Sequence, residues 1–236
     1  MKNLSLIIPF YNEERTLGEL IRQIHELPTG VVSNVIFVND GSDDHSLEVL
    51  QDSLEKYPFS AKTITKKNGG KSSAVFEGTK HLETSHVLIL DADLELNTLD
   101  VVRLWEIVIS GKSEIVFGYR QFLSQSSFTY RYARGNVFLS QAYGILYNEV
   151  ITDIMCGLKL LPSSLLQSCP FKYSKFAIEI EIPLYLWLQR LRPFELQVDY
   201  TPRSQKDGKV IGTKDAIQII FDLLYFRIFA SKKRIK

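Results

Sequence analysis

With 236 residues, 45% of them hydrophobic and 23% charged, the chain is long enough for one large α/β domain with a full core. Its formal net charge of +1 excludes the global positive field that recruits nucleic acids, so we expect no nucleic-acid partner. The two cysteines have no CxxC spacing, which excludes a cysteine zinc site and a disulfide framework.

Strand and helix patterns alternate through the first half of the chain. Strands are expected at 4–8, 35–38, 61–65 and 86–90. Helices are expected from Asn12 to Leu27, around Leu47 to Leu54, at 70–83 and at 99–108. Pro9 is expected to end the first strand and Asn12 to cap the first helix. Such alternation is typical of a mostly parallel, doubly wound sheet that binds ligands at the carboxyl ends of its strands.

The alternation loosens after Gly111. We expect a strand at 114–118, a helix at 126–147, an extended segment at 151–161, a helix at 178–191 and a strand at 194–201. The loop 202–212 is polar and carries glycines and basic residues. It is either a lid over a site or a plain solvated connection.

No linker or repeat divides the chain, so we expect one main domain at 1–215, followed by an amphipathic helix and basic tail at 216–236. The apolar run at 216–230 is interrupted by Asp222 and Arg227 and is shorter than the roughly 20 residues that span a bilayer. It either lies on an anionic membrane surface or packs on its own domain. The start of the chain is too short and too acidic for a signal peptide, and we expect a cytoplasmic location, with or without peripheral membrane contact.

The strand at 86–90 ends in two aspartates. Asp91 and Asp93 are separated by one residue, and two carboxylates at a sheet edge repel each other unless a cation lies between them. A hard divalent ion with oxygen ligands is the simplest candidate, and Glu95 can supply a third oxygen. The alternative is that the aspartates only begin a turn and that Asn97 or Thr98 caps the next helix.

Residues 68–72, NGGKS, look like part of a phosphate loop, but the first glycine of that motif would fall at Thr65. The sequence therefore excludes a Walker motif. What remains is the pair Gly69 and Gly70 before a helix, with Lys71 beside it. This arrangement either approaches a phosphate or only makes a turn.

Four motifs, in this order and spacing, resemble those of the family 2 glycosyltransferases of GT-A fold. They are PFYNEE at 9–14, VNDGS at 38–42, NGGK at 68–71 and DADL at 91–94. Downstream, GYR at 118–120, TDIMCG at 152–157, FAIEIEI at 176–182 and RSQKDGKVIG at 203–212 are similar to the branch of dolichyl-phosphate mannose synthase and related polyprenyl-phosphate sugar transferases. The resemblance implies a single α/β domain of the Rossmann-like GT-A type, with a mostly parallel sheet and helices on both faces.

The resemblance also implies a nucleoside-diphosphate sugar, carrying UDP or GDP, as the donor. The residues that match the donor site of the family are Pro9, Tyr11, Glu13, Asp40, Gly70, Lys71, Asp91 and Ala92. The residues that match the metal site, for Mg²⁺ or Mn²⁺, are Asp91, Asp93 and Glu95. The cation would neutralise the charge that builds on the departing nucleoside diphosphate.

The family inverts the anomeric carbon by direct displacement, so the acceptor decides whether a base is needed. A polyprenyl phosphate is already ionised near neutral pH and needs cations to hold it. The matching cations are Arg120, Arg131, Arg134, Arg203 and Lys209. A sugar hydroxyl needs a carboxylate base, for which Asp153 is the first candidate and Glu181 the second. The Gln-x-x-Arg-Trp element of processive synthases is missing, which favours single transfers.

Three other interpretations stay open. In one, the same donor chemistry serves a hydroxyl of a glycan, lipid or protein. In another, the chain is a haloacid-dehalogenase-like phosphatase, although that class carries its Asp-x-Asp motif on the first strand and three predicted strands precede Asp91 here. In the last, the chain is a nucleotide-sugar-binding module without catalysis.

Overall fold

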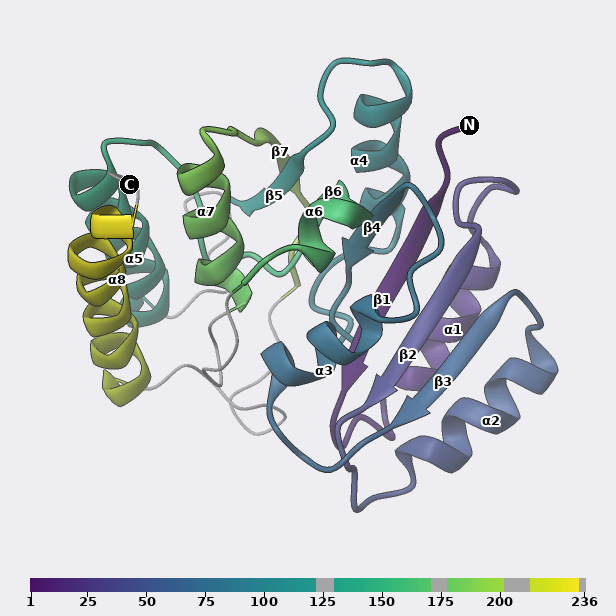
Figure 1. Ribbon diagram of the computed structural model, residues 1–236. Helices are drawn as coiled ribbons and strands as arrows, with labels where there is room; N and C mark the ends of the chain where they lie inside the picture. Colours follow the sequence, from purple (N-terminus) through teal and green to yellow (C-terminus); the bar gives the residue numbers. More distant parts are fainter. Residues whose placement is uncertain (122–129, 171–177, 202–212, 234–236) are drawn as a thin grey trace.

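The computed structural model describes residues 1–121, 130–170, 178–201 and 213–233, whose helices lie on both sides of a central sheet (Figure 1). The described strands pair in the order β3-β2-β1-β4-β6-β5-β7. They are β1 Leu4–Phe10, β2 Asn34–Asn39, β3 Ala61–Thr65, β4 His86–Ile89, β5 Val116–Arg120, β6 Lys159–Pro162 and β7 Phe194–Val198. β6 runs antiparallel to β4 and β5, and the other pairings among the described strands are parallel. The predicted mostly parallel α/β sheet is confirmed.

Helices cover both faces of the sheet, as predicted. On one face lie α1 Leu17–His25, α2 Ser46–Lys56 and α4 Leu99–Ile109. On the other face lie α3 Lys71–Thr79, α5 Tyr130–Tyr147, α6 Ser163–Gln167, α7 Ile178–Gln189 and α8 Thr213–Lys233. Figure 1 shows α5 and α8 side by side at one end of the molecule, next to α7.

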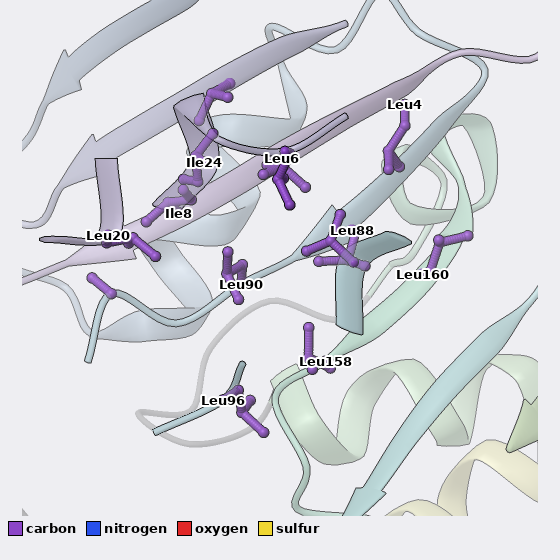
Figure 2. Close-up of a cluster of buried hydrophobic side chains, with 14 of the residues drawn as sticks. Leu4, Leu6, Ile8, Leu20, Ile24, Leu88, Leu90, Leu96, Leu158 and Leu160 are labelled. Carbon is purple, nitrogen blue, oxygen red and sulfur yellow. The ribbon is translucent and has the colours of Figure 1, made fainter. Parts of the chain in front are cut away.

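Successive side chains of the central strands enter two different cores. Leu6 and Ile8 of β1 pack with Leu20 and Ile24 of α1 (Figure 2). The intervening Ile7 belongs to the second core, which contains α3. Because both faces of these strands are buried, their sequences are continuous apolar runs. Burial of this apolar surface, at roughly 25 cal/mol per Å², holds the helices on the sheet.

The order of the strands places a topological switch point beside β1. β2 and β3 lie on one side of β1, and β4 lies on its other side. The carboxyl ends of β1 and β4 therefore flank a topological switch point, which is where open α/β sheets bind ligands. The antiparallel strand β6 begins opposite the end of β4, with Lys159 level with Ile89. The segment before β6 is thus delivered to the same edge of the sheet.

The first strand continues through Pro9 to Phe10, so the prediction that Pro9 ends this strand is wrong. β1 pairs with β2 as far as Phe10 but with β4 only as far as Ile7. Beyond Ile7 only one neighbouring strand requires hydrogen bonds from β1, so a residue without an N–H is tolerated there.

The prediction that Asn12 caps the first helix is wrong, because α1 begins at Leu17. Asn12 has a φ of 57°, a region that asparagine adopts more readily than most residues. Its side chain donates to Asp43 Oδ1 at 2.6 Å and accepts the Asp43 N–H at 3.0 Å, while Ser42 Oγ accepts the Asn12 N–H at 3.0 Å. The loops after β1 and β2 are therefore fixed to each other.

The segment predicted to be extended at 151–161 forms a strand only from Lys159. Residues 152–155 make turns, and the short helix α6 after β6 was not predicted. α5 occupies 130–147 of the predicted helix 126–147, and 126–129 lie outside the described residues. The predicted loop 202–212 is also outside them.

α8 carries apolar side chains on two faces. Ile219 and Leu223 are buried in the core shared with α5 and α7, and the Tyr147 hydroxyl donates to the Leu223 carbonyl at 2.5 Å. The exposed apolar residues of α8 are Ile217, Phe221, Leu224, Tyr225 and Ile228. Within the described part of the chain, no helix combines the length and the hydropathy that crossing a bilayer requires.

Candidate active site

Asp40, the first residue after β2, is buried and clamps the loop that follows β3. Its carboxylate accepts the N–H groups of Gly69 at 3.0 Å and Gly70 at 2.7 Å, and it pairs with the Lys66 ammonium at 2.6 Å. The adjacent Gly41 has a φ of 77°, and a Cβ there would press on the backbone of the same loop. The loop before α3 is thus anchored to the end of β2.

Lys71, the first residue of α3, joins three segments of the chain. Its ammonium lies 2.5 Å from Asp91 Oδ1, just after β4, and 2.6 Å from Glu179 Oε1 at the start of α7. Ser72 Oγ accepts the N–H of Ile178 at 2.9 Å, which fixes α3 to α7. Burial alone would lower the pKa of Lys71, but the two carboxylates outweigh it and raise that pKa above its ordinary value. Lys71 is therefore charged throughout the physiological pH range.

Gly157 leaves room for the other oxygen of the Asp91 carboxylate. A side chain at position 157 would run into Asp91 Oδ2, so glycine is the residue that fits without moving the carboxylate. Lys71 holds Oδ1 of the same carboxylate, so the position of Asp91 depends on both the Lys71 ion pair and the absence of a side chain at position 157.

The turn after Asp91 holds the other two carboxylates of the predicted metal set. Leu94 has a φ of 59°, which is uncommon for a residue other than glycine, and Asp93 Oδ1 accepts the N–H of Glu95 at 3.1 Å. The Glu95 carboxylate accepts the Tyr200 hydroxyl at 2.8 Å. Burial and the nearby Glu95 raise the pKa of Tyr200, so its hydroxyl remains a donor.

Arg120, at the end of β5, forms a bidentate ion pair with Asp153. Nε donates to Oδ2 at 2.6 Å and Nη2 to Oδ1 at 3.0 Å, and the Arg120 backbone N–H also reaches Oδ2 at 3.2 Å. The guanidinium lies 5.1 Å from the centroid of the Tyr200 ring. Burial opposes the charge of Arg120, but Asp153 more than offsets this and raises the pKa of Arg120. The site therefore contains a permanent, oriented cation.

A buried lysine supports the segment that carries Asp153. The Lys159 ammonium donates to the carbonyl of Ile154 at 3.1 Å and to that of Cys156. Burial lowers the pKa of Lys159. By holding these carbonyls, Lys159 fixes the chain between Asp153 and Gly157.

Two glutamates of α7 are buried with incomplete hydrogen bonding. Oε2 of Glu179 and Oε2 of Glu181 have no hydrogen-bond partner within the described residues. Burial, together with the charges of Glu179 and Asp222, raises the pKa of Glu181 to about 7. Glu181 is therefore partly protonated at neutral pH.

The residues predicted to hold the nucleoside lie around the end of β1. Pro9 is buried in the strand, and the Tyr11 side chain that follows it is 44% exposed. The Glu13 carboxylate accepts the Thr16 hydroxyl at 2.9 Å, and the Glu13 N–H donates to Ser46 Oγ at 2.7 Å. These contacts hold the loop after β1 against the start of α2.

Most of the predicted site residues gather at the carboxyl edge of the sheet. They are Pro9, Tyr11, Glu13, Asp40, Gly70, Lys71, Asp91, Ala92, Asp93, Glu95, Arg120 and Asp153. Glu181 lies in the first turn of α7, near Asp222 of α8, and Arg134 lies on the exposed side of α5. The side chain of Arg131, and Arg203 and Lys209 as a whole, lie outside the described residues.

Several residues of this edge were not among the predicted site residues. They are Lys66, Gly157, Lys159, Glu179 and Tyr200. For Glu179 a signal exists, because a glutamate within the apolar run IEIEI must find a cationic partner when the run is buried. Tyr200 gives no comparable signal, since its role depends on where β7 places it.

The turn 91–95 offers the carboxylate oxygens that Mg²⁺ and Mn²⁺ prefer. In the parts of the chain that the structure describes, no three histidine, cysteine, aspartate or glutamate side chains converge into a metal site made by protein alone. Asp91 faces Lys71, and Glu95 faces Tyr200. The donor set fits a cation held by one or two carboxylates and completed by substrate phosphates.

The sequence is similar to those of known proteins. The family model described as glycosyl transferase family 2 matches residues 5–177. An undecaprenyl-phosphate 4-deoxy-4-formamido-L-arabinose transferase of Edwardsiella ictaluri is 27% identical over 226 residues, which cover 94% of this chain and 66% of that protein. A dolichol-phosphate mannosyltransferase of Pyrococcus furiosus is 35% identical over 117 residues, which cover 50% of this chain and 33% of that protein. The chain thus matches less than two thirds of the length of these curated relatives.

A solved structure shares the fold. The glucosyl-3-phosphoglycerate synthase of Mycobacterium tuberculosis, in complex with Mn²⁺, uridine diphosphate and phosphoglyceric acid, superposes with a TM-score of 0.74. The superposition covers 97% of this chain and 79% of that one, at 18% sequence identity. At this identity the likeness concerns the α/β architecture alone.

Proposed function

Because the chain belongs to glycosyltransferase family 2, we propose that it moves a hexose from a UDP- or GDP-sugar to a polyprenyl phosphate, with inversion at the anomeric carbon. One observation carries the proposal. Carboxylates suited to a divalent ion, at Asp91 and Asp93, and permanent cations suited to phosphate groups, at Lys71 and Arg120, share one edge of the sheet beside the switch point.

We assign the nucleoside to the ends of β1 and β2. The exposed ring of Tyr11 suits stacking with a base, and the Glu13 carboxylate suits base N–H groups or ribose hydroxyls. Pro9 lies beside them, and Asp40 holds the loop that carries Gly70.

We assign the diphosphate to the start of α3 and the end of β4. Lys71 adds an ammonium to the partial positive charge of a helix N-terminus, which favours anions. Gly70 lets the backbone come close to a ligand because it has no side chain. Asp91 and Ala92 form the facing wall.

Asp91, Asp93 and Glu95 are the proposed protein ligands of Mg²⁺ or Mn²⁺. When bound, the cation neutralises charge on the departing nucleoside diphosphate. The Tyr200 hydroxyl fixes the direction of the Glu95 carboxylate, and the left-handed conformation of Leu94 fixes the turn. The neighbouring structure that contains Mn²⁺ and uridine diphosphate supports this assignment by analogy of fold.

The proposed acceptor is a lipid phosphate held by cations. Arg120 is oriented by Asp153, and the other proposed contacts are Arg131, Arg134, Arg203 and Lys209. An ionised phosphate oxygen needs no base to activate it, and both oxygens of Asp153 already accept hydrogen bonds from Arg120. In this proposal Asp153 is a positioning residue for Arg120.

The exposed side of α8 supports a lipid rather than a water-soluble acceptor. Five apolar side chains of this helix are exposed, and Phe138 and Ile145 of the adjoining α5 are exposed as well. Such a surface suits the boundary between lipid headgroups and acyl chains. We therefore propose peripheral contact with a membrane, with α5 and α8 facing the lipid.

The alternative is transfer to a hydroxyl of a glycan, lipid or protein, which requires a base. Glu181 has a pKa of about 7, which suits a general base near neutral pH, and this observation keeps the alternative open. A phosphatase of the haloacid-dehalogenase class is disfavoured because Asp91 follows β4, the fourth strand.

The function is tested by product analysis. The purified chain is incubated with MnCl₂, each of several UDP- and GDP-hexoses, and a short polyprenyl phosphate incorporated into detergent micelles. The expected result is a glycosylated lipid phosphate and one equivalent of UDP or GDP, both lost in Asp93→Asn and after chelation by EDTA. Release of inorganic phosphate, or transfer only to hydroxyl acceptors, would overturn the proposal.

A further inference from the structure

The ammonium of Lys71 lies against Asp91, one of the proposed ligands of the divalent ion. It lies 2.5 Å from Asp91 Oδ1, while Oδ2 lies in the space that a side chain at position 157 would fill. Two cations cannot share one carboxylate oxygen at such distances without strong repulsion. A metal ion can therefore use Oδ1 of Asp91 only if Lys71 moves away from it.

Glu179 offers a second position for the same ammonium. Its Oε1 already lies 2.6 Å from Lys71 Nζ, and its Oε2 is buried without a hydrogen-bond partner in the described residues. An unpaired buried carboxylate oxygen is unfavourable unless some state of the protein pairs it. The four-carbon stem of lysine is flexible enough to carry the ammonium from one carboxylate to the other.

We propose that Lys71 is an internal counter-ion, which neutralises Asp91 in the metal-free protein and shifts fully onto Glu179 when a divalent cation binds. The inference rests on the proposed function, because it takes Asp91 as a metal ligand. It adds Glu179 as a positioning residue that keeps Lys71 beside the diphosphate site. It also makes the Lys71 ion pair a competitor of the metal.

Two substitutions test the two halves of this exchange. Lys71→Met removes the competitor and is expected to tighten the binding of Mn²⁺ alone about tenfold. Glu179→Gln removes the charge that receives the ammonium, keeps Lys71 on Asp91 and is expected to weaken Mn²⁺ binding about tenfold. Lys67→Met is the matched control, because it removes one positive charge from the same loop at an exposed position, and its affinity is expected to stay near that of the wild type.

Removing either charge would change the Mn²⁺ affinity in the same direction even if the ammonium did not move. The double variant Lys71→Met/Glu179→Gln distinguishes the two explanations. If the ammonium moves between the carboxylates, Glu179→Gln has little effect in the Lys71→Met background, since no ammonium is left to receive. If the charges act independently, the two effects add.

Mn²⁺ binding is measured by electron paramagnetic resonance on the full chain, with thermal unfolding as the check of folding. If Lys71→Met does not fold, Lys71→Gln replaces it in the same measurement. Additive effects in the double variant, or unchanged affinity on loss of Lys71, would overturn the exchange. If the chain transfers no sugar but its variants change the Mn²⁺ affinity as expected, only the proposed function is refuted. Absence of Mn²⁺ binding in every variant, with UDP or GDP present as well as without, would overturn both.

Discussion

Arg120 and Asp153 join the end of β5 to the segment before β6 through two parallel hydrogen bonds, Nε to Oδ2 at 2.6 Å and Nη2 to Oδ1 at 3.0 Å. The side chain of Arg120 is 13% exposed and that of Asp153 is fully buried. Removing one partner of a buried ion pair destabilises a protein much more than replacing both partners with apolar residues. The pair therefore sets both the stability of this edge and the direction of the guanidinium.

Asp153→Ala is expected to destabilise the fold by about 3–5 kcal/mol, because it leaves Arg120 buried and unpaired. The double variant Arg120→Met/Asp153→Leu is expected to lose less than the sum of the single truncations. Urea denaturation measures these changes. Lys80→Ala breaks the ion pair with Glu77 on the surface of α3 and serves as the control, with an expected loss below about 1 kcal/mol. Additive losses at positions 120 and 153 would contradict the paired role.

Gly157→Ala is expected to weaken Mn²⁺ and nucleotide binding while the protein stays folded. The new methyl group would overlap Asp91 Oδ2 and push the carboxylate out of its place. Calorimetric titration with MnCl₂ and UDP or GDP measures the effect. Gly18→Ala is the control, because a Cβ there would meet its nearest atom, Ser53 Oγ, at an ordinary 3.4 Å. Equal affinities of Gly157→Ala and the wild type would show that Asp91 does not depend on this contact.

Much of the fold was predictable because short stretches of the sequence mark where each strand begins and ends. Apolar runs such as 35–38 and the turn residues Asn39 to Ser42 mark where strands end, and strand ends of a parallel sheet meet at one edge. The reversed direction of β6 was not predictable, since nothing in Lys159–Pro162 distinguishes an antiparallel from a parallel strand.

The contacts within the site depend on tertiary structure and were harder to predict. Asp40 was predicted to touch the nucleoside, and the structure adds that both its oxygens hold the loop of Gly69 and Gly70. Lys71 was predicted to approach a phosphate, but its bridge between Asp91 and Glu179 joins residues far apart in the sequence. A single sequence does not reveal such long-range pairs.

Glu181→Gln is expected to stabilise the protein increasingly as the pH rises from about 4.5 to 7. The pKa of Glu181 is raised to about 7 from 4.5, so the folded state binds more protons than the unfolded state in this range. The stability of the wild type therefore falls with rising pH, by up to about 3 kcal/mol at 1.36 kcal/mol per pKa unit. Glutamine does not titrate, so the Glu181→Gln variant does not lose this stability as the pH rises.

Urea denaturation of the wild type and Glu181→Gln at several pH values measures the difference between the two curves. Asp222→Asn removes one of the charges that raise the pKa of Glu181 and is expected to make the decline with pH smaller. Parallel curves for the wild type and Glu181→Gln would show that Glu181 titrates as in the unfolded chain.

The double variant Phe221→Ser/Tyr225→Ser is expected to bind anionic lipid vesicles at least about tenfold more weakly than the wild type. These two rings lie one helical turn apart on the exposed side of α8, and each is more than half exposed, so neither substitution removes core packing. Burial of a ring in the lipid interface is worth on the order of 1.5–3 kcal/mol. The loss on removing two rings should therefore be visible in co-sedimentation.

Ile109→Ser is the control for this experiment, because Ile109 is similarly exposed but lies on α4, on the opposite face of the sheet. Its vesicle binding is expected to equal that of the wild type. If the α8 variant also binds like the wild type, basic residues alone account for any lipid attraction, and raising the salt concentration should then abolish it. If the α8 variant loses binding at every salt concentration, the apolar face itself enters the lipid, as transfer to a polyprenyl phosphate requires.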